Sequence, residues 1–74
     1  MTKLMDFIRE LKARHIFFEL SAPTDAVMVE ITVPGERWEV EFSEDGEIAV
    51  EVFVSPGVIS DESKLQDLFD RFSD

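Results

Sequence analysis

The chain reads RWEVEFSEDGEIAVEVFV over residues 37–54, two runs of alternating apolar and polar residues separated by a turn sequence. Such alternation is typical of β-strands with one buried face. A two-residue Asp-Gly turn would place Val50 opposite Glu41 and put a core valine on the charged face. A three-residue loop over 44–46 avoids this, and Gly46 supplies the positive φ that the loop requires. The resulting pairs join like with like: Val40 with Val50, and Glu39 with Glu51.

Two more strands are predicted upstream of this hairpin. Residues 27–33 alternate in the same way, and a Pro-Gly turn at 34–35 joins them to the hairpin. This turn extends both rows: Val29 pairs with Val40, and Glu30 with Glu39. Residues 15–20 keep the inward phase, and the turn residues at 22–25 close a third hairpin. Its predicted pairs are Phe18 with Val29, and Phe17 with Glu30.

Both ends of the chain are predicted to be helical, from residue 2 to about Arg14 and again after Ser60. Each segment has one apolar stripe at helical spacing. The stripes are Leu4, Phe7, Ile8 and Leu11 in the first, and Leu65, Leu68, Phe69 and Phe72 in the second. The expected fold is a single α+β domain over residues 1–74, a four-stranded antiparallel meander with both helices packed on its apolar face. Trp38 belongs to the apolar phase and is expected in the core.

Charge narrows the classes of partner. The net charge is −10, and residues 15–62 contain twelve acidic side chains with Arg37 as their one Lys or Arg. Nucleic-acid binding requires a basic stripe, and anionic membrane surfaces repel acidic proteins, so neither is expected as a partner. A basic protein would be attracted. Because the apolar runs are far shorter than a membrane helix and the N-terminus lacks a signal-peptide pattern, the chain is predicted to be soluble and cytoplasmic.

Catalytic chemistry finds little support in the sequence. His15 is the single histidine, cysteine and tyrosine are lacking, and the serines have no nucleophile-elbow context. His15 is interpreted as a solvated residue. Paired glutamates can act as acid and base, but such chemistry requires a pocket, and the prediction is an open sheet face. The sequence therefore predicts a protein that is not an enzyme and holds no cofactor.

The outer face of the predicted sheet is the candidate partner-binding surface. Glu39 lies at the centre of an acidic row, with Phe17 and Phe53 exposed on the two edge strands. The candidate residues are Glu30, Glu39, Glu41, Glu51, Phe17 and Phe53. Exposed aromatic side chains beside a charged patch are typical of interfaces. Two alternatives stay open: a merely solvated face, and a metal site, although a flat row cannot surround a Ca²⁺ ion with six to eight ligands.

Several short pieces of the chain stand out together: PGERWEVEF at 34–42, Asp45-Gly46, and Leu68-Phe69 with Phe72-Ser73. With these pieces the chain resembles a class of small acidic bacterial proteins, some of which are thought to be immunity proteins or antitoxins. The resemblance covers most of residues 15–74 and transfers no catalytic residue. It implies a neutralising partner for a basic toxin or nuclease, in which Glu39 and its neighbours meet Lys and Arg of the target and Phe17 or Phe53 fills a pocket.

A homo-oligomer is the competing hypothesis. An exposed phenylalanine or an unpaired edge strand could meet its copy in a homodimer. Two acidic faces cannot stack on each other without counterions, so an edge-to-edge arrangement would be required. Self-association of the purified protein distinguishes this hypothesis from binding of a basic partner.

Overall fold

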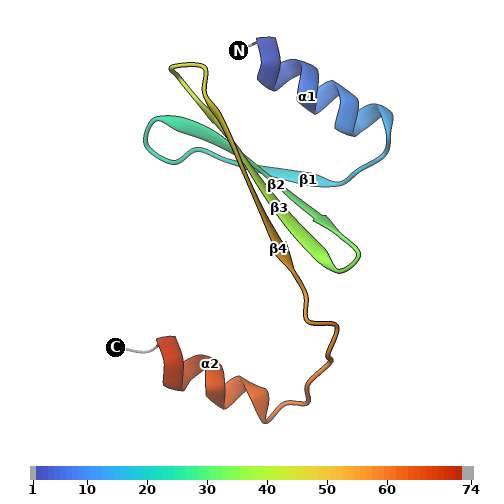
Figure 1. Cartoon of the computed structure of the whole chain (residues 1–74), viewed down its shortest axis with the longest axis vertical. Helices are drawn as coiled ribbons and strands as arrows, with labels where there is room; N and C mark the ends of the chain where they lie inside the picture. Colours follow the sequence, from blue (N-terminus) through green and yellow to red (C-terminus); the bar gives the residue numbers. More distant parts are fainter. Residues whose placement is uncertain (1, 73–74) are drawn as a thin grey trace.

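The computed structural model describes residues 2–72 and has the predicted α+β order of elements (Figure 1). All strand pairs are antiparallel and form one open sheet in the order β1-β2-β3-β4. The elements are α1 (Thr2–Ala13), β1 (Phe18–Ser21), β2 (Ala26–Val33), β3 (Glu36–Ser43), β4 (Ile48–Val54) and α2 (Lys64–Phe72). Neither α1 nor α2, the helices found in residues 2–72, has the length and apolar character needed to cross a membrane.

Both central hairpins have the register that the alternation predicts. Val40 lies opposite Val29 of β2 and Val50 of β4. In the β3–β4 loop the Gly46 amide donates to the Ser43 carbonyl at 3.0 Å, and Gly46 has a φ of 91°. The predicted three-residue loop is therefore confirmed, and glycine occupies the position that disfavours a side chain.

The first hairpin differs from its predicted register by two residues. Phe18 lies opposite Ile31, so the predicted pairing of Phe18 with Val29 is wrong. The cause is a wider connection, in which the Ala26 amide donates to the Pro23 carbonyl at 3.2 Å. Because the start of β2 pairs with β3 alone, it extends beyond the end of β1.

This shift changes the composition of the outer face. A slip of two residues leaves each side chain on its predicted face, because side chains alternate with a period of two. It does bring Glu19 opposite Glu30, the place predicted for Phe17. Phe17 precedes β1 and is 69% exposed.

The core joins α1 to the inner face of the sheet. Its buried side chains are Leu4, Ile8, Leu11, Val29, Ile31 and Val40. At its margin Phe7 packs against Phe42 with ring centroids 5.6 Å apart. A helix is about 10 Å wide and neighbouring strands are about 4.8 Å apart, so a single helix covers roughly two strands. The four-stranded sheet is thus only partly covered by α1.

A left-handed residue ends α1. His15 has a φ of 58°, its amide donates to the Lys12 carbonyl at 3.1 Å, and the Ile16 amide donates to the Leu11 carbonyl at 2.9 Å. This hydrogen-bond pattern is the Schellman motif, completed by apolar contact between the residues at its ends. Leu11 and Ile16 both belong to the core or its margin, whereas His15 is exposed. His15 therefore has a structural place at the helix end.

The second helix stands apart from the sheet (Figure 1). None of its described residues is buried, so the prediction that both helices pack on the apolar face is wrong for α2. Two residues expected in the core are consequently accessible: Val50 is 55% exposed and Trp38 is 36% exposed. Trp38 donates its indole N–H to the Glu36 carboxylate at 2.9 Å.

The segment between β4 and α2 directs the chain away from the sheet. Its first amide, that of Ser55, donates to the Gly35 carbonyl at 2.8 Å. The Gly57 amide then donates to Ser55 Oγ at 3.1 Å, and Gly57 has a φ of 78°. Pro56 between them fixes its own φ. These contacts hold the start of residues 55–63 at the end of the sheet.

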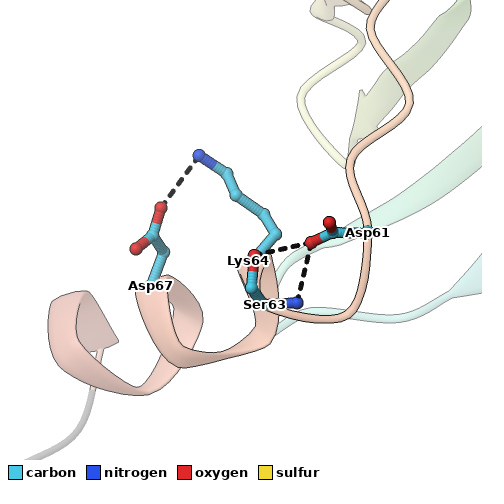
Figure 2. Close-up of polar contacts among 4 residues, drawn as sticks. All are labelled: Asp61, Ser63, Lys64 and Asp67. Atoms are coloured by element: carbon cyan, nitrogen blue, oxygen red, sulfur yellow. Dashed lines mark hydrogen bonds and ion pairs between the residues drawn. The ribbon is translucent and has the colours of Figure 1, made fainter.

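The start of α2 depends on Asp61 instead of the predicted Ser60. Figure 2 shows the Asp61 carboxylate accepting hydrogen bonds from the Ser63 amide at 3.0 Å and from the Ser63 hydroxyl. Within the first turn of α2, Lys64 Nζ lies 2.9 Å from the Asp67 carboxylate. A carboxylate at this position is stabilised by free amides and by the positive end of the helix dipole.

The start of α2 is expected to depend on pH. The hydroxyl and amide of Ser63 lower the pKa of Asp61 below its ordinary value of 3.8. A lowered pKa means that the ordered helix start is fully favoured above pH 3.8 and loses this contribution as the pH falls through the lower value. NMR titration of the Ser63 amide should therefore show loss of its hydrogen bond only below pH 3.8. Asp61→Asn keeps a hydrogen-bond acceptor that does not titrate, so the NMR signal of its Ser63 amide should not change over this pH range. Equal changes of the Ser63 signal in wild type and Asp61→Asn would contradict this prediction.

Candidate protein-binding surface

The outer face of the sheet carries one glutamate from each strand in a continuous line. Cross-strand partners place Glu19 opposite Glu30, Glu30 opposite Glu39, and Glu39 opposite Glu51. We call Glu19, Glu30, Glu39 and Glu51 the acidic row. The alternation of the strands forces all four onto the same face, because each follows or precedes an inward-facing residue. Glu39 is half-buried and the other three are exposed.

Arg37 is the positive charge beside this row. Its guanidinium lies 3.6 Å from the Glu39 carboxylate and 4.4 Å from the ring centroid of Phe53. Arg37 therefore partly neutralises Glu39 and covers one face of the Phe53 ring. Glu30 has no such cation, since the ion pairs found in residues 2–72 do not include it.

Repulsion along the row is large enough to matter. Neighbouring cross-strand side chains are about 5 Å apart, and at this separation two like charges repel by roughly 0.8 kcal/mol in water. Contacts of this kind change sheet stability by about 0.2–1 kcal/mol per pair. With three neighbouring pairs and one ion pair at Glu39, the free protein retains uncompensated repulsion, greatest around Glu30.

The remaining predicted site residues lie around the row, not within it. Glu41 is half-buried on the same face, opposite Met28 and Ala49. Phe53 lies opposite Arg37 and is 37% exposed. Phe17, before the start of β1, has more accessible surface than Phe53. The structure thus brings the glutamates together, whereas Phe53 is occupied by an internal cation and Phe17 is outside the strand.

Residues 2–72 contain no group of three or more His, Asp or Glu side chains placed to hold a metal ion. Comparison of the chain with protein-family models, curated proteins and solved structures finds no match. The function of this surface is therefore inferred from the chain's own residues.

Sequence reasoning missed Glu19 as a member of the row. The phase of residues 15–20 already placed it on the outer face, but the predicted tight turn put Phe17 opposite Glu30. The Ala26 amide, held by the Pro23 carbonyl, delays pairing of β2 with β1, and alternation gives no signal for this because a two-residue slip keeps every side chain on its face. Sequence reasoning also missed the contact of Arg37 with Phe53, although the predicted register of β3 and β4 places these two residues opposite each other.

Proposed function

We propose that the protein is a non-enzymatic binding module whose acidic row receives a basic surface of a partner protein. The observation that carries this proposal is the row itself, four side-by-side glutamates with one neighbouring arginine. Such a row costs stability in the free chain, and a positively charged partner removes that cost. The face belongs to an open sheet, which suits a protein surface better than a small substrate.

A toxin or nuclease with a basic substrate-binding surface is the proposed class of partner. A nuclease surface is arranged to neutralise phosphates with Lys and Arg, so a row of carboxylates can occupy it. The chain's net charge of −10 favours rapid, salt-sensitive association with such a surface. A cytoplasmic setting, expected from the sequence, belongs to the same proposal.

Capture experiments with Glu30→Lys test this function. Glu30 sits inside the row without an ion pair, so its reversal places a positive charge where the partner's cations would bind. Wild-type protein used as bait in a lysate of the source cells should capture a basic protein, and Glu30→Lys should reduce that capture at least 10-fold. The association rate of wild type with the captured partner should fall as salt is raised.

Glu62→Lys is the matched control, because it changes the net charge equally at an exposed position between β4 and α2. It should capture the partner as wild type does. Equal capture by wild type and Glu30→Lys, or capture of acidic proteins and nucleic acids alone, would show that the row is only a solvated surface.

A homo-oligomer is the second candidate function. It is favoured by a different observation, the apolar surface that α1 leaves uncovered on the inner face. This surface is on the opposite side of the sheet from the acidic row, so self-association through it is compatible with partner binding.

A further inference from the structure

Half of the inner sheet face is apolar and open. On β3 and β4 the exposed inward-facing apolar side chains, with their exposed fractions, are Trp38 (36%), Ile48 (44%), Val50 (55%), Val52 (39%) and Val54 (70%). β3 contributes Val40 to the core with α1, whereas every residue of β4 is exposed. Between this surface and α1 is a shallow groove of about 390 Å³, lined by Phe7, Trp38, Val40, Phe42, Ile48 and Val50, with Lys3 and Asp6 of α1 at its margin. A contiguous apolar surface of this kind in a small protein marks an interaction site.

The second helix has an apolar stripe without a partner in the chain. Its members are Leu65, Leu68, Phe69 and Phe72, which are 52% to 71% exposed. The segment leading to the helix adds Val58 at 71% and Ile59 at 99% exposed. A helix of nine residues is marginal in water unless its apolar face is packed. The apolar stripe of α2 and the apolar groove between α1 and β4 are therefore two complementary surfaces on the same chain.

We propose that two copies of the chain exchange their C-terminal helices, so that α2 of each copy packs into the groove between α1 and β4 of the other. A chain that carries both a surface and its complement can form a closed, two-fold symmetric pair with two identical contacts. Exchange of an identical element is a low-cost route to such a dimer. Each sheet thereby gains the second helix that its four strands require.

The path of the chain favours the other copy over the chain's own groove. Ser55 and Gly57 are held by the hydrogen bonds described above, which direct residues 55–63 away from the sheet (Figure 1). The radius of gyration is 15.6 Å, whereas a compact single domain of this length has about 11 Å. The extended arrangement is the one that a helix-exchanged subunit adopts.

The available area suits a stable dimer. Phe69 and Phe72 are 60% and 71% exposed, and a phenylalanine buries about 150–250 Å² when covered. These two side chains from both copies contribute roughly 500 Å². The receiving grooves lose a similar area, and the leucines and residues 58–59 add to it, so the total reaches the roughly 1,200–2,000 Å² of stable interfaces.

Charge also permits this pairing. The open half-face of β3 and β4 is apolar except for Glu36, whose carboxylate accepts the Trp38 indole N–H, and α2 carries equal numbers of basic and acidic side chains: Lys64 and Arg71, Asp67 and Asp70. The acidic rows lie on the outer faces, so they do not stack on each other in the exchanged dimer. The dimer would leave two acidic rows free for partners.

Trp38 provides the first test, because it is the only tryptophan and lies on the receiving face. Native mass spectrometry should find dimers, and the Trp38 emission should shift to shorter wavelength as the protein concentration rises through the dissociation constant. Leu68→Glu should raise that constant at least about 100-fold, since it places a charge in both symmetric contacts. Gln66→Glu adds the same charge to the polar side of α2 and should change the constant less than threefold.

Mixing two defective variants tests the exchange itself. Leu68→Glu damages the helix and Val50→Glu damages the groove, so neither variant should dimerise alone. A mixture should form a heterodimer, because the intact helix of the Val50→Glu chain fits the intact groove of the Leu68→Glu chain. If the helices are exchanged, dimers should form in the mixture and not in either variant alone.

Three results would overturn the exchange proposal: a monomer whose Trp38 emission does not depend on concentration, a Leu68→Glu dimer as tight as wild type, or a mixture that fails to associate. The first result means that α2 does not pack on a second copy, and the second means that the copies meet elsewhere. Capture of a basic partner by Leu68→Glu should persist in every case. Failure of the exchange is thereby distinguishable from failure of the acidic-row function.

Discussion

Leu11→Ala is expected to lower the free energy of unfolding by about 3 kcal/mol. Leu11 is 5% exposed and packs with α1 and the sheet, and its carbonyl accepts the Ile16 amide that ends the helix. Truncation leaves a cavity at the place where the helix is joined to β1. A domain of this size has a total stability of roughly 4–10 kcal/mol, so one such change removes a large fraction of it.

Urea denaturation at one fixed protein concentration measures this effect, because association would otherwise change the apparent stability. Leu20→Ala is the control, since Leu20 has the inward phase but is 53% exposed. It should cost less than about 1 kcal/mol. Equal losses in the two variants would mean that α1 does not form the core on which the fold depends.

The registers of the central strands could be predicted from the sequence because errors there have a high energetic cost. A one-residue slip between β2 and β3 would exchange Val40 with a glutamate and bury charge. The turn residues agree with this constraint, since Gly46 has the positive φ that the loop requires. The alternation and the turn residues predict the same register for the central strands, and the structure confirms it.

The register of β1 was less strongly determined. A slip of two residues keeps every side chain on its face, so alternation cannot detect it. The outcome depends on the conformation around Pro23, where the Ala26 amide is held by the Pro23 carbonyl. The consequence for the candidate site is substantial, because Glu19 replaces Phe17 at the end of the acidic row.

The position of α2 could not be obtained from amphipathicity. Its stripe predicts that the helix packs on something apolar, but the pattern is the same for its own sheet and for another surface. In the structure residues 55–63 lead α2 away from the sheet, beginning at Ser55, whose amide donates to the Gly35 carbonyl. Trp38 and Val50 were therefore correctly placed on the inner face, yet they are exposed.

Glu30→Lys is expected to stabilise the free protein by about 1–2 kcal/mol while weakening partner binding. Glu30 lies between Glu19 and Glu39, so the reversal converts two repulsive cross-strand pairs into attractive ones. Glu30→Gln removes the repulsion without adding attraction and should give about half of the gain. Because these charges are exposed, the gain should decrease as salt is raised.

Urea denaturation of wild type, Glu30→Lys and Glu62→Lys distinguishes repulsion within the acidic row from the general effect of net charge on stability. Both variants change the charge of the chain equally, so a general relief of self-repulsion would stabilise them alike. A larger gain at Glu30 means that the local row is the source of the repulsion. If Glu30→Lys is also the variant that loses the partner, reduced capture cannot be attributed to unfolding, because the protein is then more stable than wild type.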